Sequence, residues 1–159
     1  MNLTTVISTV AATTGTAVVG SIASQDTKSR WYRKLRKPGF QPPAAAFPIV
    51  WTALYADIAV TSASAIDALT EQERFDERRN YIAALAANLA LNASWSWVFF
   101  KAHRLVPATA VAAALAVSSA DLTRRTAAAN PVAGAALSPY AVWTGFATVL
   151  SGRIAQLNK

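Results

Sequence analysis

Aromatic and amide side chains recur one helical turn apart in three separate apolar segments of this chain. Trp51 and Tyr55 lie four positions apart, as do Asn88 and Asn92 in a later segment, and Trp143 lies in a third. Residues three or four positions apart share one face of a helix, so each segment presents its set on one face. Flat aromatic walls with a few hydrogen-bonding groups suit the binding of a flat organic ligand.

The first set consists of Trp51, Leu54, Tyr55 and Ile58, which share one expected helical face. Trp51 lies near the start of its segment, so the alternative for it is an aromatic residue at a membrane interface, where Trp and Tyr are enriched. Tyr55 lies one turn deeper and fits that alternative less well. Both interpretations stay open at this point.

The second set is Asn88, Asn92 and Trp95, again on one face. An amide inside a membrane helix needs a partner, because an unsatisfied polar group in hydrocarbon costs several kcal/mol. The two asparagines either bond to neighbouring helices in a structural role, or at least one of them faces an internal polar cavity.

The third set contains Tyr140, Trp143, Phe146 and Ala147. Ala147 follows Trp143 by one turn, and a small residue there leaves room beside the indole ring for a flat ligand. Ordinary helix packing is the alternative. Pro139 is expected to kink this helix or to begin it.

Three further residues in or beside the apolar segments can ionise. Asp57 lies about two turns inside its segment and has no evident partner, which makes it a candidate functional acid. Asp121 lies near a segment end, where Arg124 or Arg125 can pair with it. His103 is more consistent with a solvated loop side chain than with a haem ligand.

Composition excludes several classes of chemistry. The chain has no cysteine and one histidine, which rules out disulfides, thiolate nucleophiles and sites with several histidine ligands. No Ser-His-Asp set, phosphate-binding loop or dinucleotide fingerprint is present. We therefore expect no metal site, no required cofactor and no catalytic set of a known type.

Length and hydropathy indicate one integral membrane domain, residues 1–159. The chain is 53% hydrophobic with mean hydropathy +0.28, and only 14% of its residues are charged, against a usual fraction of about 25%. Five segments approach the ~20 apolar residues that a spanning helix needs. The expected fold is an all-α bundle of five transmembrane helices, at about 3–24, 46–69, 81–100, 106–122 and 134–157.

The alternative is a soluble helical bundle, because many of the apolar residues are alanine. Residues 81–93 argue against it, since they offer no charged face to water. The third segment also has small residues four positions apart, Ala86, Ala90 and Ser94, that would allow close helix contact within the bundle or in a homodimer.

Charge distribution sets the expected orientation. Ten of the fifteen Lys and Arg residues fall on the side that holds residues 25–45 and the C-terminus. Cytoplasmic loops collect such residues, so we expect this side in the cytoplasm and the N-terminus outside. Residues 1–25 hold no Lys or Arg, which favours a first membrane helix over a cleaved signal peptide. The basic loop should meet anionic lipid headgroups rather than nucleic acid.

Ordered motifs along the chain carry a more specific signal. They are Trp31-Tyr32-x-x-Leu35-x-Lys37-Pro38, Gln41-Pro42-Pro43, Val50-Trp51-Thr52-x-Leu54-Tyr55, Asn92-x-x-Trp95 and Pro139-Tyr140-x-x-Trp143. With them the chain resembles the TspO/MBR family, the tryptophan-rich sensory proteins whose animal relative is the mitochondrial translocator protein. The resemblance covers nearly the whole chain.

The resemblance implies a five-helix membrane bundle, often dimeric, in the bacterial cell membrane. It also implies a ligand pocket under loop 25–45, which would act as a lid, and a tetrapyrrole such as a porphyrin or haem precursor as the ligand. Residues matching the family pocket are Tyr32, Pro42, Trp51, Asn92, Trp143 and Ala147, and the helical faces described above add Tyr55, Asn88, Trp95 and Phe146.

The function implied is a receptor, sensor or transporter. Some bacterial relatives promote light-dependent porphyrin breakdown, and for that activity Trp51 and Trp143 would be the reactive residues. A structural scaffold is the remaining alternative. The family's animal members carry a sterol-recognition pattern with a Tyr near the end of the fifth helix, and residues 147–153 contain none, which argues against a sterol ligand.

Overall fold

The chain folds entirely into helices connected by short turns and one longer loop. The computed structural model describes the backbone of residues 1–159 and every side chain except that of Asp26, and the described residues contain no strand. The helices are α1 (Leu3–Ser24), α2 (Arg30–Lys34), α3 (Ala46–Glu71), α4 (Phe75–Ser96), α5 (Leu105–Ala129) and α6 (Pro131–Leu157), with a 3₁₀ turn, η1 (Gln25–Lys28), and a π-helical segment, η2 (Trp97–Lys101).

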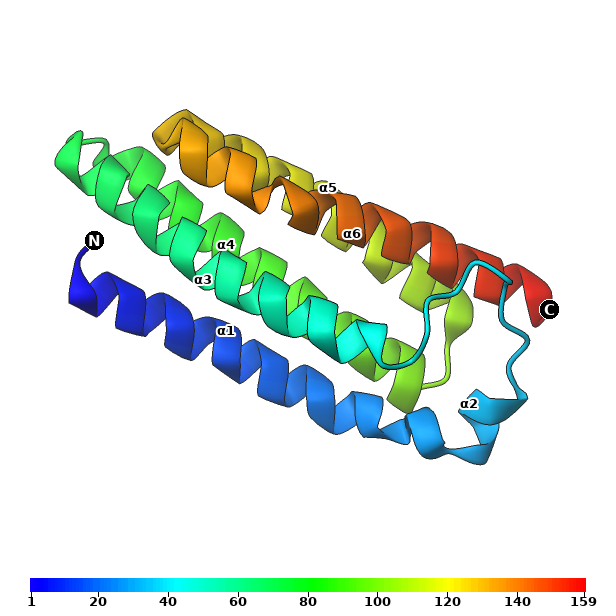
Figure 1. Cartoon of the computed structure of the whole chain (residues 1–159). Coiled ribbons are helices and arrows are strands. Elements are labelled where there is room, and N and C mark those ends of the chain that lie inside the picture. The colour runs from blue at the N-terminus through cyan, green and yellow to red at the C-terminus, as the bar shows by residue number, and fades with distance from the viewer.

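The five long helices lie side by side along one axis (Figure 1). α1 packs against α3 and α4 on one side of the bundle, and α5 and α6 pack closely on each other on the opposite side. α2 and the loop after it cross the end of the bundle where α6 finishes, while the N-terminus lies at the other end. We call the end where α6 finishes the loop end.

Four helical stretches are long and apolar enough to cross a membrane: Leu3–Ser24, Ala46–Glu71, Phe75–Lys101 and Leu105–Ala129. The expected all-α membrane fold is confirmed to this extent. α6 has 27 residues but is not among the four, so the fifth span is not established. Its hydropathy is reduced by polar residues such as Thr144 and Ser151, which are buried against the bundle.

Three helix boundaries differ from the sequence-based expectation. α4 begins at Phe75 rather than near residue 81, α5 continues to Ala129 rather than 122, and α6 begins at Pro131 rather than 134. Pro139 lies inside α6 and does not begin it. Hydropathy marks only the apolar part of a helix, whereas these helices continue into charged turns beyond it.

Side-chain contacts account for the added turns. Arg79 pairs with Asp76 in the first turns of α4, at 2.9 Å. Near the end of α5, Asp121 accepts hydrogen bonds from Arg124 and Arg125, both at 2.7 Å, which confirms the expected local pairing. Between α5 and α6, the Asn130 side chain caps the new helix by accepting from the Val132 backbone N–H. A proline in the first turn of a helix costs no hydrogen bond, so Pro131 suits this start.

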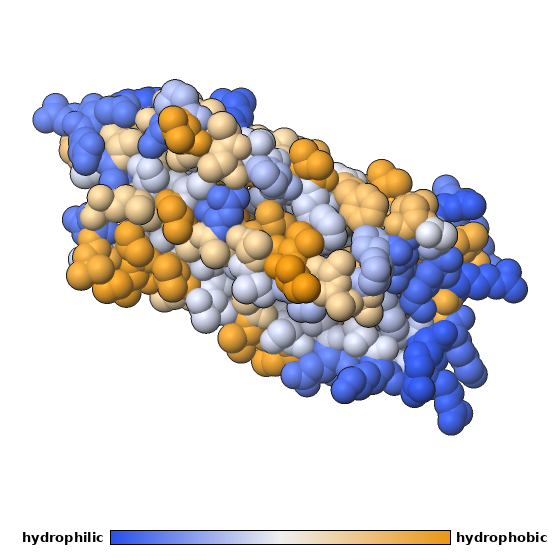
Figure 2. Space-filling model, in the orientation of Figure 1, coloured by the Kyte–Doolittle hydropathy of each residue, from blue (hydrophilic) through white to orange (hydrophobic). Residues whose placement is uncertain are grey.

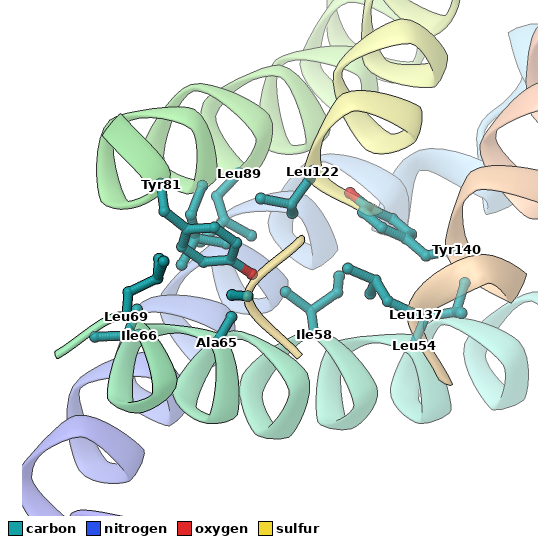
Figure 3. Close-up of a cluster of buried hydrophobic side chains, with 12 residues drawn as sticks. Leu54, Ile58, Ala65, Ile66, Leu69, Tyr81, Leu89, Leu122, Leu137 and Tyr140 are labelled. Carbon is teal, nitrogen blue, oxygen red and sulfur yellow. The ribbon is translucent and has the colours of Figure 1, made fainter. Parts of the chain in front are cut away.

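The largest buried cluster joins α3, α4, α5 and α6 (Figure 3). Tyr81 and Tyr140 point into it from α4 and α6, among aliphatic side chains that include Ile58 and Leu122. The Tyr81 hydroxyl donates to Ser62 Oγ at 3.2 Å and lies 2.8 Å from Thr126 Oγ1. This end of the core is therefore fixed by polar contacts as well as by packing.

α5 and α6 approach closely at Gly134. A Cβ atom placed on Gly134 would lie 2.4 Å from the Ala127 Cα, which is backbone and cannot rotate away. Glycine at this position is required by the contact between the two helices rather than by an unusual backbone angle. Tight packing of this kind holds α6 to the bundle.

We expect Gly134→Ala to destabilise the protein by about 1–3 kcal/mol, since it overpacks a rigid contact. The matched control is Gly15→Ala in α1, where nothing lies within 4 Å of the new methyl group. The measurement is the thermal unfolding midpoint of each variant in detergent. Equal midpoints for the two variants would contradict the close contact of α5 and α6.

Candidate functional site

A chain of hydrogen bonds crosses the interior of the bundle and joins α3, α4, α5 and α6. The Tyr55 hydroxyl on α3 donates to Asn92 Oδ1 on α4 at 2.7 Å, and Asn92 Nδ2 donates to the Tyr140 hydroxyl on α6 at 3.1 Å. Asn92 and Tyr140 are both buried. Asn92 therefore uses both its side-chain oxygen and its side-chain nitrogen in hydrogen bonds to other helices.

The same chain continues to α5. The Tyr140 hydroxyl donates to Asn88 Oδ1 at 2.7 Å, and Asn88 Nδ2 donates to Ser118 Oγ and Ser119 Oγ, both at 3.1 Å. Asn88 is fully buried. Its oxygen and its amide hydrogens are thus engaged by neighbouring helices, which is the structural role that the sequence left as one alternative.

Five aromatic rings gather on the loop-end side of this chain, and we call them the aromatic site. The ring centroids of Trp51 and Trp143 lie 6.4 Å apart with the planes at 85°, so the indoles meet edge to face. Trp51 stacks on Tyr55 at 5.6 Å, and Trp143 contacts Phe47 at 6.0 Å and Phe146 at 5.5 Å. The rings come from α3 and α6.

A second group of rings lies at the end of α4, and we call it the loop-side cluster. Trp95 stacks on Phe99 at 5.2 Å and meets Phe100 edge to face at 5.8 Å. The π-helical turn of η2 buries both consecutive phenylalanines, and such turns are frequent at functional sites. Trp31 and Tyr32 of α2 rest on Phe99 and Phe100 at 5.8 and 5.7 Å.

The loop is fastened over the end of the bundle by polar contacts. The Asn158 side chain donates to the Arg36 carbonyl at 2.8 Å and accepts from the Arg36 backbone N–H at 2.9 Å. Lys37 Nζ donates to the Tyr32 carbonyl at 2.9 Å and lies 4.4 Å from the centroid of the Tyr32 ring. Phe40 reaches Phe146 of the aromatic site, at 6.2 Å between centroids.

Two buried polar atoms in this region have no partner among the described residues: Trp143 Nε1 and Gln41 Oε1. Two other indoles of the bundle are satisfied, since Trp95 Nε1 donates to Ser151 Oγ and Trp97 Nε1 donates to the Val19 carbonyl. Buried polar groups are nearly always hydrogen-bonded, so an unpartnered donor and an unpartnered acceptor indicate where a ligand could bind.

The structure separates the ten predicted ligand residues into groups. Six of them belong to the hydrogen-bonded chain or the aromatic site, and one of the six, Phe146, also contacts the loop. Tyr32 and Trp95 belong to the loop-side cluster, while Pro42 in the loop and Ala147 on α6 are half-buried. The first group is Trp51, Tyr55, Asn88, Asn92, Trp143 and Phe146.

Three residues of the region were not among the predicted ligand residues. The sequence could have indicated Gln41 as a binding residue, because it is the one amide in a loop segment of prolines and aromatics. Phe47 lies four residues before Trp51, which places it on the same helical face. Tyr140 shares its face with Trp143, but its central position between Asn88 and Asn92 depends on how three helices pack.

The remaining ionisable candidates lie outside the aromatic site. His103 is exposed, and its ring stacks on Trp31 with centroids 3.9 Å apart, so it supports α2. Asp57 is half-buried, and its carboxylate forms no hydrogen bond or ion pair with the described residues. Among the described residues, no group of three His, Cys, Asp or Glu could hold a metal ion. Hydrophilic atoms gather over the loop end (Figure 2).

Comparison with known proteins agrees with this architecture. The model of the TspO/MBR family matches residues 7–157. The chain is 30% identical over 142 residues to a tryptophan-rich sensory protein of Cereibacter sphaeroides, with 89% of this chain and 84% of the relative covered.

Two further relatives extend the comparison. The translocator protein of Homo sapiens is 30% identical over 134 residues, covering 84% of this chain and 78% of the relative. The membrane protein YtaB of Bacillus subtilis is 29% identical over 128 residues, covering 80% of both chains.

We expect Tyr140→Phe to destabilise the bundle by about 1–3 kcal/mol, because it leaves buried Asn88 and Asn92 atoms without a partner. Tyr32→Phe is the control, since the Tyr32 hydroxyl forms no hydrogen bond with the described residues, and it should change stability by less than about 0.5 kcal/mol. Unfolding in detergent measures both. A loss no larger for Tyr140 than for Tyr32 would contradict the role of the hydrogen-bonded chain.

Proposed function

Because this chain belongs to the TspO/MBR family, we propose that it is a membrane receptor, sensor or transporter for a tetrapyrrole bound beneath loop 25–45. The names of its relatives, sensory protein and translocator protein, support this class of function. The ligand is a porphyrin or a haem precursor, and the protein requires no cofactor of its own.

The observation that carries the proposal is the unpartnered indole N–H of Trp143 inside the aromatic site. A tetrapyrrole offers a flat ring that can stack against indole and phenyl faces, together with carboxylate and nitrogen acceptors. Trp143 Nε1 would donate to such an acceptor. The shape of the site and its unused donor thus match the two parts of the ligand.

The loop supplies the rest of the recognition. Gln41 has a buried oxygen without a partner, which can accept from a ring N–H of the ligand. Arg33, Lys34 and Arg36 are exposed at the loop end, where they can meet propionates or lipid headgroups. Lys37 is folded back onto Tyr32 and stabilises the loop instead.

Entry of a ligand requires the loop to move. The Asn158 contacts with Arg36 and the stacking of Trp31 on His103 hold it in the closed position. Both contacts lie near the surface, where hydrogen bonds exchange with water at little net cost. The loop therefore acts as a lid.

The proposal includes five membrane spans, with α6 as the fifth, in a bacterial cell membrane. α6 is long enough to cross, and two of its polar residues, Thr144 and Ser151, are buried against the bundle. The ten basic residues at the loop end favour the cytoplasm for this end and the outside for the N-terminus. A homodimer through the exposed small residues of α4 stays a prediction.

We expect Trp143→Phe to weaken protoporphyrin IX binding by about tenfold, the factor that one hydrogen bond of about 1.4 kcal/mol would give. An aromatic ring is retained at this position, while the five-membered part of the indole is lost together with its N–H; the control variant loses the same atoms. Porphyrin absorbance during titration of the purified protein measures the affinity. Trp97→Phe is the matched control, because its N–H already donates to the Val19 carbonyl outside the aromatic site.

Equal affinity of the Trp143 variant and the wild type would sink the proposed role of the indole. Absence of saturable binding by the wild type would instead favour a structural scaffold whose aromatic residues only pack helices.

The edge-to-face pair of Trp51 and Trp143 favours a second candidate function, light-dependent breakdown of the bound porphyrin. Excited porphyrin held against two indoles lies next to readily oxidised rings. In this case Trp51 and Trp143 would be the reacting residues of the protein.

Illumination of protoporphyrin IX in air with the protein should then yield products that illumination without protein does not. The expected result is a new absorbance spectrum with the wild type and its loss in the Trp51→Phe/Trp143→Phe variant. Identical product spectra with and without protein would exclude this activity.

A further inference from the structure

A hollow lies on the outer surface between α1 and α4, in the half of the bundle away from the loop end. Its volume is about 320 Å³, near the lower limit of roughly 300–1,000 Å³ for ligand sites. Ala12 of α1 and Leu85, Ala86 and Leu89 of α4 line it, and Ile66 of α3 adds to its wall. We call it the α1–α4 groove.

The groove presents mainly carbon. Ser8 and Thr9 also line it, but Ser8 Oγ donates to the Thr4 carbonyl at 2.8 Å and Thr9 Oγ1 donates to the Val6 carbonyl at 3.1 Å. Both hydroxyls thus use their donors on their own helix. A groove of this composition on the outer face of a membrane bundle suits a hydrocarbon chain.

Arg78 is the one charged residue that lines the groove. Its neighbours Arg74 and Arg79 pair with acids of the same helical turn, Glu77 and Asp76. Arg78 has no ion pair among the described residues, and its Nε is buried without a partner. The guanidinium therefore retains a donor at the mouth of the groove.

One acid of α3 near this end is also engaged elsewhere. Asp67 Oδ2 accepts from the Asn2 backbone N–H at 2.6 Å, which ties the start of α1 to α3. Arg78 lies in the first turn of α4, where a membrane helix meets the headgroup region. A negative group in the groove would thus meet an unopposed guanidinium.

We propose that the α1–α4 groove binds one anionic phospholipid, with an acyl chain along Ala12, Leu85 and Ala86 and the phosphate on Arg78. A guanidinium binds phosphate oxygens through directed pairs of N–H groups, and the buried Nε is one such donor. The apolar groove and the charge at its mouth complement the two parts of this lipid. The site is separate from the lid end and does not depend on the proposed tetrapyrrole binding.

The test compares phosphatidylglycerol with phosphatidylcholine in native mass spectrometry of the full-length protein in detergent. The wild type should retain one phosphatidylglycerol at least tenfold more than phosphatidylcholine. Arg78→Gln should abolish this preference. Arg79→Gln removes an equal charge one residue away on an exposed side chain, and it should retain the preference within twofold.

A second variant, Ala86→Leu, fills the groove without changing any charge and should also reduce retention at least fivefold. Glycerol phosphate, which has the headgroup without the chains, should not compete. Unfolding midpoints and protoporphyrin titration should match the wild type for all three variants, which keeps failure here distinct from failure at the lid end.

Equal loss in the Arg78 and Arg79 variants would show a general charge effect and overturn the proposal. Competition by glycerol phosphate would assign Arg78 to free anions, and a protein dimer that dissociates on Ala86→Leu would assign the groove to a second copy. Either of these outcomes also overturns it.

Discussion

Side-chain polar groups inside a bilayer have no water to replace a missing partner, and this constraint governs how α3 to α6 are placed. Tyr55, Asn92, Tyr140 and Asn88 satisfy one another in sequence and end on two serines of α5. Each bond fixes one helix relative to the next. Sliding α6 by a single turn would move Tyr140 away from both asparagines. The hydrogen-bonded chain therefore sets the register of the helices, and with it the position of the aromatic rings.

The same constraint distinguishes the tryptophans from one another. The Trp95 indole is tied to Ser151 and the Trp97 indole to the α1 backbone, so both serve the framework. The Trp143 indole sits in the same region, held by phenyl rings, with its donor unused. Trp143 thus differs from Trp95 and Trp97 in having a buried donor without a partner, and this difference marks the aromatic site as a place where an acceptor could bind.

Much of this could be predicted from the sequence. The helices, the shared face of Trp51 and Tyr55, and the pairing of Asp121 follow from spacing alone. The start of α4 was missed because its first turns are charged. For α6 the sequence did hold a start signal, because Asn130 can cap a helix and Pro131 can occupy its first turn. Other features depend on packing of distant segments: Tyr140 between two asparagines, the π-turn that buries Phe99 and Phe100, and the unpaired Arg78 have no signature in local sequence.

The contact between Arg36 and Asn158 bears on the order of assembly. It joins residues that are 122 positions apart. Bringing two such distant residues together costs conformational entropy, and this cost is offset only once the helices between them are packed. α6 must be in place before its side chain can reach the loop. The polar contact that fastens the loop over the bundle therefore forms only after the last long helix has docked.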